Sequence, residues 1–122
     1  MSKVKKSSYV DYVVNDVFCR LEGVTARAMF GGYGLYLDGK IFGLIADEVL
    51  YFKTDGSNRP EYEARGSRPF TYETAKGRRV AMSYWEVPSE ILEDVQLVAE
   101  WAKISASLLK PSKNTERGSK NT

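Results

Sequence analysis

The side chains best suited to binding chemistry form a basic stretch in the second half of the chain. Arginines and lysines stand there with Phe70 and Tyr72 between them. A guanidinium fork suits phosphate, and an aromatic face suits a nucleobase. The sequence therefore offers a candidate anion or nucleic-acid patch, although a solvated helix face followed by a mobile loop explains the same residues. We call these residues the basic patch: Arg65, Arg68, Lys76, Arg78 and Arg79.

Catalytic groups of the most familiar kinds are missing from the sequence. It contains no histidine, which excludes Ser-His-Asp and Cys-His catalysis and histidine metal ligands. Cys19 has no second cysteine and no base beside it, so we interpret it as a small, partly buried residue. Carboxylates recur at Asp47 and Glu48 and near residues 61–63 and 90–94, but nothing indicates that they are buried. We predict no catalytic, metal-binding or cofactor-binding residues and no enzyme.

A glycine run at Gly31-Gly32-Tyr33-Gly34 has the composition of a phosphate-binding loop. The context does not fit, because no Gly-Lys-Ser/Thr follows and the next predicted element is a strand. Glycine at these positions is better explained by a bulge, a sharp bend or close packing. We therefore predict a structural role for the run.

Length and composition predict one soluble globular domain. The chain has 122 residues, 43% of them hydrophobic and 28% charged, and no apolar run approaches the length of a membrane span. A single cysteine fits a reducing cytoplasm, and the first residues do not form a secretory signal. The two ends carry a net charge of +3 each, which leaves the body at −4. We predict a flexible basic N-terminus at 1–7, a folded domain at 8–109 and a disordered basic tail at 110–122.

Hydrophobic spacing predicts a helix followed by an antiparallel meander in the first half of the chain. A stripe from Val10 to Leu21 has helical spacing, with Ser8 at its start and Gly23 as its stop. Four strands follow, and Asp38-Gly39 is a strong signal for a type I′ turn between the second and third. The predicted strands are 25–30, 33–37, 40–46 and 49–53.

The second half of the chain predicts a short helix, one or two strands and a long helix. Pro60 and Gly66 suit the ends of a short helix anchored by Tyr62. We interpret residues 67–79 as a loop that contains a short strand near 70–72, and we predict a further strand at 80–85. The last helix is predicted to begin after Pro88 and to end at Leu108, with a break near Asp94 as an alternative to one continuous helix. The predicted fold class is α+β, with an antiparallel meander sheet packed against the N- and C-terminal helices and a short helix between strands.

Several of these segments together resemble the TfoX/Sxy N-terminal domain family. The matching segments are 27–39, 42–46, 50–53, 69–72 and 82–88, within a likeness that covers about residues 8–107. The Met-Phe-Gly-Gly-Tyr-Gly run and the later Tyr-Trp-x-Val-Pro are its most specific parts. The motif residues, which we expect to be structural, are Arg27, Met29, Phe30, Gly31, Gly32, Tyr33, Gly34, Asp38, Gly39 and Pro88.

The resemblance implies an α+β domain related to regulators of natural competence in bacteria, which act with the cAMP receptor protein at competence promoters. It supplies no catalytic residues. Regulators of that type carry a second, helical domain after this one, whereas this sequence ends soon after its last predicted helix. We therefore expect a stand-alone N-terminal domain.

The leading hypothesis is a cytoplasmic, non-enzymatic protein–protein interaction module in transcriptional regulation. Its partner is expected to be a protein, for which the cAMP receptor protein is a candidate, and a homodimer through the free sheet face or an edge strand is a further expectation. Tyr36, Tyr51 and Tyr84 are the candidate interface aromatics. The alternative is direct nucleic-acid binding through the basic patch and the tail. An enzyme acting on a small anionic ligand is a third, disfavoured hypothesis, and no membrane association is expected.

Overall fold

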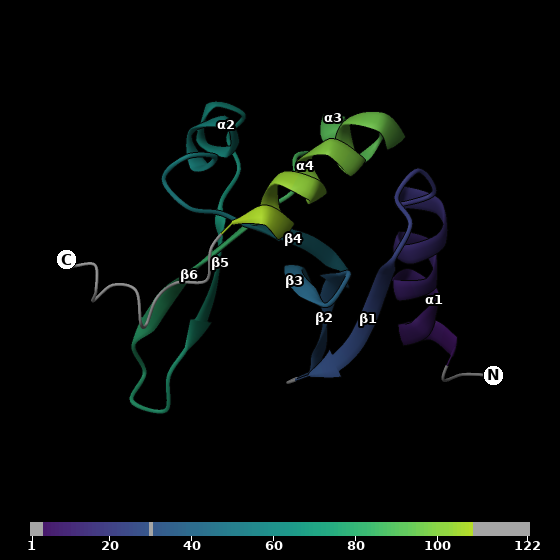
Figure 1. The fold of residues 1–122 in the computed structure, drawn as a ribbon. Helices are drawn as coiled ribbons and strands as arrows, with labels where there is room; N and C mark the ends of the chain where they lie inside the picture. Colours follow the sequence, from purple (N-terminus) through teal and green to yellow (C-terminus); the bar gives the residue numbers. More distant parts are fainter. Residues whose placement is uncertain (1–3, 30, 109–122) are drawn as a thin grey trace.

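The structure is a computed structural model that describes residues 4–29 and 31–108. Phe30, the tail 110–122 and the start of the predicted N-terminal segment 1–7 lie outside this part of the chain. Within it the predicted α+β single domain is confirmed: strands form one open sheet, and helices cover one side of it (Figure 1).

The sheet has six antiparallel strands in the order β1-β2-β3-β4-β6-β5. The first four form the predicted meander, and β6 then lies beside β4 and leaves β5 at the edge. β5 confirms the short strand predicted near 70–72 and extends it by one residue at each end, and its pairing with β6 leaves residues 74–78 as the turn. The strands are β1 (Val24–Met29), β2 (Gly32–Leu37), β3 (Lys40–Ala46), β4 (Val49–Lys53), β5 (Pro69–Glu73) and β6 (Arg79–Glu86).

Tight turns connect the meander strands. Asp38 and Gly39 have φ values of 52° and 84°, the positive values of the predicted type I′ turn. Asp47 and Glu48 join β3 to β4 with φ values of 51° and 59°, although neither is glycine. Both turns match the twist of the flanking strands, so the meander folds through local contacts.

The first helix differs from its prediction at both ends. α1 (Val4–Tyr12) begins before Ser8, so Ser8 does not cap it, and it continues as a π-helical turn, η1 (Val13–Val17). The amide of Phe18 donates to the carbonyl oxygen of Val13 at 3.0 Å, five residues back. The helix ends there rather than at Gly23. Val13, Val17 and Phe18, which belong to this wider turn or follow it directly, are all buried in the core.

The remaining helices follow the expected order. α2 (Arg59–Ala64) lies between β4 and β5, and α3 (Ser89–Leu92) leads into α4 (Val95–Ser107). The break predicted near Asp94 is confirmed, because its carboxylate accepts hydrogen bonds from the amides of Gln96 and Leu97 at 3.1 Å each. Asp94 is therefore the N-cap of α4, and the two helices form separate segments.

The core lies between the sheet and the helices, and three phenylalanines form its centre. The Phe18 ring is 5.5 Å from Phe42 and 6.1 Å from Phe52, centroid to centroid. A bulge in β3 makes this possible, because Leu35 pairs with Gly43 and Tyr36 with Ile41, which leaves Phe42 as the extra residue. The bulge sends Phe42 into the core and leaves its neighbour Ile41 on the opposite face of the sheet.

Candidate functional site

The glycine run lies where β1 turns into β2, and its packing explains the residue type. A Cβ atom on Gly32 would lie 2.3 Å from the carbonyl oxygen of Ile45 on β3. A Cβ atom on Gly34 would lie 3.0 Å from the Met29 methyl group and 3.3 Å from the ring of Tyr36. Glycine here allows close strand contact and lets two larger side chains lie across the sheet.

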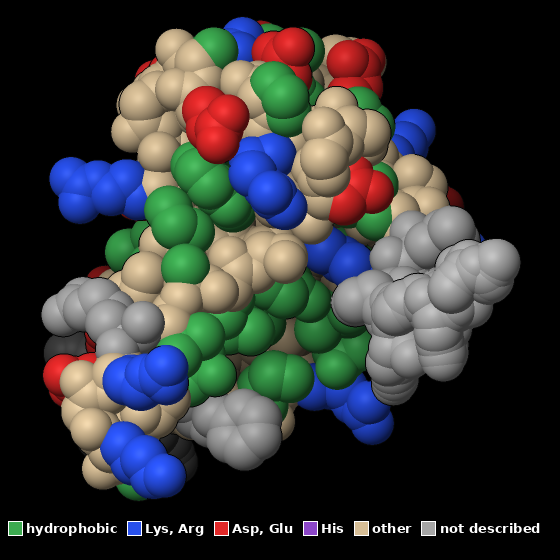
Figure 2. Space-filling view, turned by 90° about the vertical axis from the view of Figure 1, so that its left-hand side faces the viewer, with side chains coloured by type: hydrophobic (Ala, Val, Ile, Leu, Met, Phe, Trp, Pro, Cys, Tyr) green, Lys and Arg blue, Asp and Glu red, His purple; other side chains and the backbone are tan. Residues whose placement is uncertain are grey.

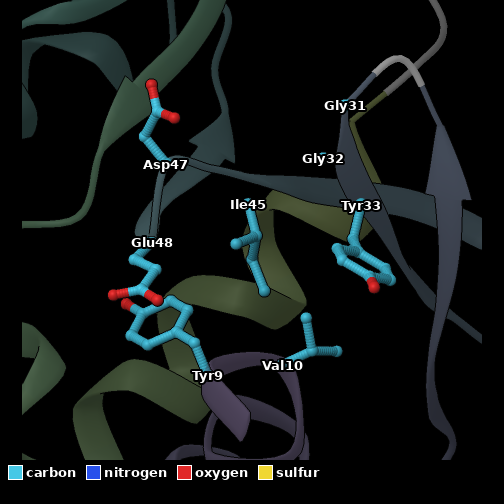
Figure 3. Close-up of a pocket in the computed structure, with 8 residues that line it drawn as sticks. All are labelled: Tyr9, Val10, Gly31, Gly32, Tyr33, Ile45, Asp47 and Glu48. Carbon is cyan, nitrogen blue, oxygen red and sulfur yellow. The ribbon is translucent and has the colours of Figure 1, made fainter. Parts of the chain in front are cut away.

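A hollow of about 430 Å³ lies between α1 and the turns at the ends of β2 and β3 (Figure 3). Figure 3 shows the Glu48 carboxylate beside the ring of Tyr9, with Tyr33 across the hollow and Asp47 turned away. Burial, followed by the charges of nearby groups that include Glu48, raises the pKa of Tyr9. The phenol is therefore neutral at physiological pH.

This hollow does not assemble a catalytic pair. Its two carboxylates, Asp47 and Glu48, are both exposed and belong to one turn, and no lining residue is a nucleophilic serine, a cysteine or a lysine. Among the described residues no group of three or more Cys, Asp and Glu side chains is placed to hold a metal ion. No described helix has the length and apolar character to cross a bilayer.

The structure does not bring the basic patch together. Arg65 follows α2, whereas Lys76 and Arg78 lie in the turn between β5 and β6, and Figure 1 places α2 and this turn at opposite ends of the molecule. Arg68 is exposed just before β5, and Arg79 begins β6 opposite Glu73. The sequence cluster is therefore two separate basic sites.

Arg65 makes several contacts within the protein. Its guanidinium lies 3.1 Å from a carboxylate oxygen of Glu61 and 3.2 Å from one of Glu90. It also lies 5.2 Å from the ring centroid of Trp101, and that ring packs against Tyr62 at 4.8 Å. Arg65 thus links α2 to α3 and α4, which leaves it poorly placed to bind an external phosphate.

The β5–β6 turn, in contrast, presents its cations to solvent. The Thr74 amide donates to the Arg78 carbonyl at 2.8 Å, and the Thr74 hydroxyl oxygen accepts from the Arg78 amide at 3.2 Å. Lys76 and Arg78 are both exposed. A well-bonded turn therefore holds two cations at the end of a two-stranded ribbon.

The sheet face turned away from the helices, which we call the open face, carries an apolar surface. Its centre is a hollow of about 300 Å³. Figure 2 shows hydrophobic side chains gathered in a hollow on this side of the molecule, with lysine and arginine side chains at its margins. An apolar concave surface on one face of a sheet is typical of a binding site. The large side chains that line it are Met29, Ile41, Leu44, Phe70, Met82 and Tyr84.

The three predicted interface tyrosines all belong to the open face. Tyr51 pairs with Leu44 in the sheet, Tyr36 pairs with Ile41, and Tyr84 lies opposite Lys53. All three tyrosines are half-buried, and burial raises the pKa of Tyr51 and of Tyr84. Tyr51 and Tyr84 therefore contribute neutral phenols to a mainly apolar surface.

Comparison with protein families places this fold in a known group. A family model described as the TfoX N-terminal domain matches residues 16–108. The chain belongs to the TfoX N-terminal domain family. The resemblance predicted from the motifs is confirmed, and the match covers the whole sheet and α2 to α4. A comparison with curated proteins finds no match.

Other motif residues of this TfoX N-terminal domain shape the sheet and the start of α3. The Arg27 guanidinium lies 5.6 Å from the ring centroid of Tyr36 on the open face. Pro88 precedes α3, and its carbonyl oxygen accepts from the amides of Ile91 and Leu92 at 3.0 and 2.9 Å. These contacts are structural in kind, and none requires a ligand.

Sequence reasoning missed several residues of the open face. The alternation of Phe70 with Tyr72, and of Val80, Met82 and Tyr84, has the period of two that puts side chains on one face of a ribbon. This spacing predicts the strands near 70–72 and at 80–85, but it does not show that they pair with each other and with β4, which brings their side chains to the same face as the meander residues. Ile41 was hidden for a different reason, because the bulge at Phe42 interrupts the alternation along β3.

Proposed function

We propose that this TfoX N-terminal domain is a non-enzymatic binding module that acts in transcriptional regulation by holding a protein partner on its open face. The apolar hollow lined by Met29, Leu44 and Met82 carries the proposal, because the described helices bury the other side of the sheet and leave this one available. Family membership supports a competence-regulator-like role. Cys19 is exposed, and not partly buried as the sequence predicted, and a single free thiol supports action in the cytoplasm.

The cAMP receptor protein is the partner to test first. Fluorescence anisotropy of promoter-length DNA, at low and at physiological salt, should show binding of this chain only when the cAMP receptor protein is also present. Binding that needs that protein at both salt concentrations supports a protein-mediated role. Absence of any effect of the chain on the complex would contradict it.

Direct nucleic-acid binding is the second candidate, and one observation favours it. Lys76 and Arg78 extend from the turn of the β5–β6 ribbon and are exposed. Binding through them should occur without a partner and weaken steeply with salt. The double variant Lys76→Glu/Arg78→Glu should then lose DNA affinity, whereas Lys103→Glu on α4 should not. Equal affinities of the two variants would exclude this candidate.

A further inference from the structure

The hollow of the open face is lined in a way that suits apolar side chains. Apart from glycine and alanine, its lining consists of aliphatic, thioether and aromatic groups, and the phenol of Tyr84 is the polar side-chain group on this face. Two of the lining residues are Met29 and Met82, whose flexible thioethers adapt to different partner shapes. The occupant should therefore insert a few hydrophobic side chains.

Basic residues surround this hollow. Arg27 lies over Tyr36, Lys40 lines the adjoining surface with Ile41, and Lys76 and Arg78 lie at the end of the ribbon that carries Phe70 and Met82. Figure 2 shows lysine and arginine side chains on more than one side of the apolar area. Burial, followed by the charges of Glu86 and Asp47, raises the pKa of Tyr51, but the residues that line the hollow include no Asp or Glu. The rim therefore complements a negatively charged occupant.

Backbone chemistry decides which kind of segment fits. Across the floor of the hollow, β2, β3 and β6 each pair with a strand on both sides, so an extended peptide lying over them would find no partners for its own amides. A helix satisfies its own backbone and presents an apolar stripe at i, i+3, i+4 and i+7.

Other occupants fit less well. A second copy would bring the same cations to the rim. Single-stranded nucleic acid would have to stack on rings that already have partners, because Arg27 lies over Tyr36 and Tyr51 packs edge to face against Phe70.

We propose that the open face binds an acidic amphipathic helix of a partner protein, with hydrophobic side chains in the hollow and Asp or Glu side chains against the rim cations. This inference rests on the proposed function, because it names the chemistry of the partner that the same face would hold.

The two methionines of the hollow allow a direct test. The full chain is labelled with ¹³C at the methionine methyl groups, and its resonances are followed by NMR during titration with designed peptides of roughly 18 residues, long enough to form a helix. The first peptide carries leucine at helical spacing and glutamate on both flanks. The second replaces glutamate with lysine, and the third replaces leucine with serine. Shifts of the Met29 and Met82 methyl resonances with the first peptide, and with neither of the others, are the expected result.

Charge variants complete the test. The double variant Lys76→Glu/Arg78→Glu should bind the first peptide with an affinity on the order of tenfold lower. The matched variant Lys103→Glu, exposed on α4, should bind this peptide with the affinity of the wild type. Because these residues are exposed, the variants should fold normally, which the unchanged dispersion of the NMR spectrum would verify.

Several results would overturn the inference. Equal binding of the acidic and basic peptides would remove the role of the rim. Shifts that depend on protein concentration alone would identify a second copy as the occupant, and shifts with an oligonucleotide of about 12 bases would identify nucleic acid. No shift with any probe would also contradict it. The proposed function would still stand if the cAMP receptor protein, added to the same sample, shifted these resonances.

Discussion

The rings of Tyr51 and Phe70 pack edge to face with their centroids 5.1 Å apart, across the intervening strand β6. This contact joins β4 to the edge strand β5 near the point where the β5–β6 ribbon extends beyond β4, which pairs only with residues 84–86 of β6. The shape of the open face depends on the ribbon, because Phe70 and Met82 of the ribbon line the hollow together with Met29 and Leu44 of the meander.

Replacing Phe70 with leucine should therefore loosen the ribbon without emptying the site. Phe70→Leu should lower the free energy of unfolding by about 0.5–1.5 kcal/mol, the usual contribution of an aromatic pair. Tyr72→Leu is the matched control, since Tyr72 is 45% exposed on the same strand, and it should change stability by less than about 0.5 kcal/mol. Urea unfolding, monitored by circular dichroism, measures the free energy of unfolding of both variants. Equal losses in the two variants would show that the ring contact does not contribute.

Ser105 should be important for the attachment of α4 to the sheet. Its hydroxyl donates to the carbonyl oxygen of Lys53 at 2.7 Å, and the side chain is fully buried. Ser105→Ala leaves that carbonyl without this donor, so it should cost about 1–3 kcal/mol of stability. Ser107→Ala removes a hydroxyl that donates to Ile104 on the exposed side of the same helix, and it should cost much less. A larger loss for Ser107→Ala would contradict the assignment.

The close approach at Gly32 predicts strong intolerance to any side chain. Gly32→Ala puts a methyl group against the Ile45 backbone, which cannot move without separating β2 from β3, and should destabilise the protein by about 1–3 kcal/mol or more. Gly56→Ala, where nothing lies within 4 Å of the added atom, should be close to neutral. Thermal unfolding of the two variants tests this. A Gly32→Ala protein as stable as the wild type would disprove the packing argument.

Acid should weaken the loop that follows β4. The Asp55 carboxylate accepts hydrogen bonds from the hydroxyl and the amide of Ser57, and these bonds hold the pKa of Asp55 below its ordinary value of 3.8. Because the folded pKa is the lower one, this stabilisation is present above the unfolded pKa and is lost as the pH falls through the folded pKa. Asp55→Asn should therefore reduce the fall in urea midpoint between about pH 6 and pH 3. Ser57→Ala should reduce it partly, and unchanged curves for both would contradict the prediction.

The fold could be predicted from the sequence where local signals agreed. The Asp38-Gly39 turn, the four meander strands and the break at Asp94 each depend on neighbouring residues, and each appears in the structure. The sequence also predicts strands near 70–72 and at 80–85, but Pro69, Gly77 and scattered charges weaken strand propensity there and conceal that the two strands pair as a ribbon.

The site was harder to predict than the fold. The basic patch appeared as one cluster because its members are close in sequence, whereas the structure separates Arg65 from Lys76 and Arg78 by the length of the ribbon. The open face, in turn, combines residues from several strands. Its hollow depends on the bulge at Phe42 and on the place of β6 beside β4, and neither can be read from local spacing.

The most direct test of the account is the affinity of the cAMP receptor protein for variants on the two sides of the sheet. Met82→Glu puts a charge in the hollow, and Leu97→Glu puts the same charge on α4, where Leu97 is 37% exposed. Biolayer interferometry should show a loss of at least about tenfold for Met82→Glu and no change for Leu97→Glu. If the Met82→Glu protein fails to fold, Met82→Gln takes its place as the test variant. Equal affinity of wild type and Met82 variants, or a loss confined to Leu97→Glu, would contradict a partner site on the open face.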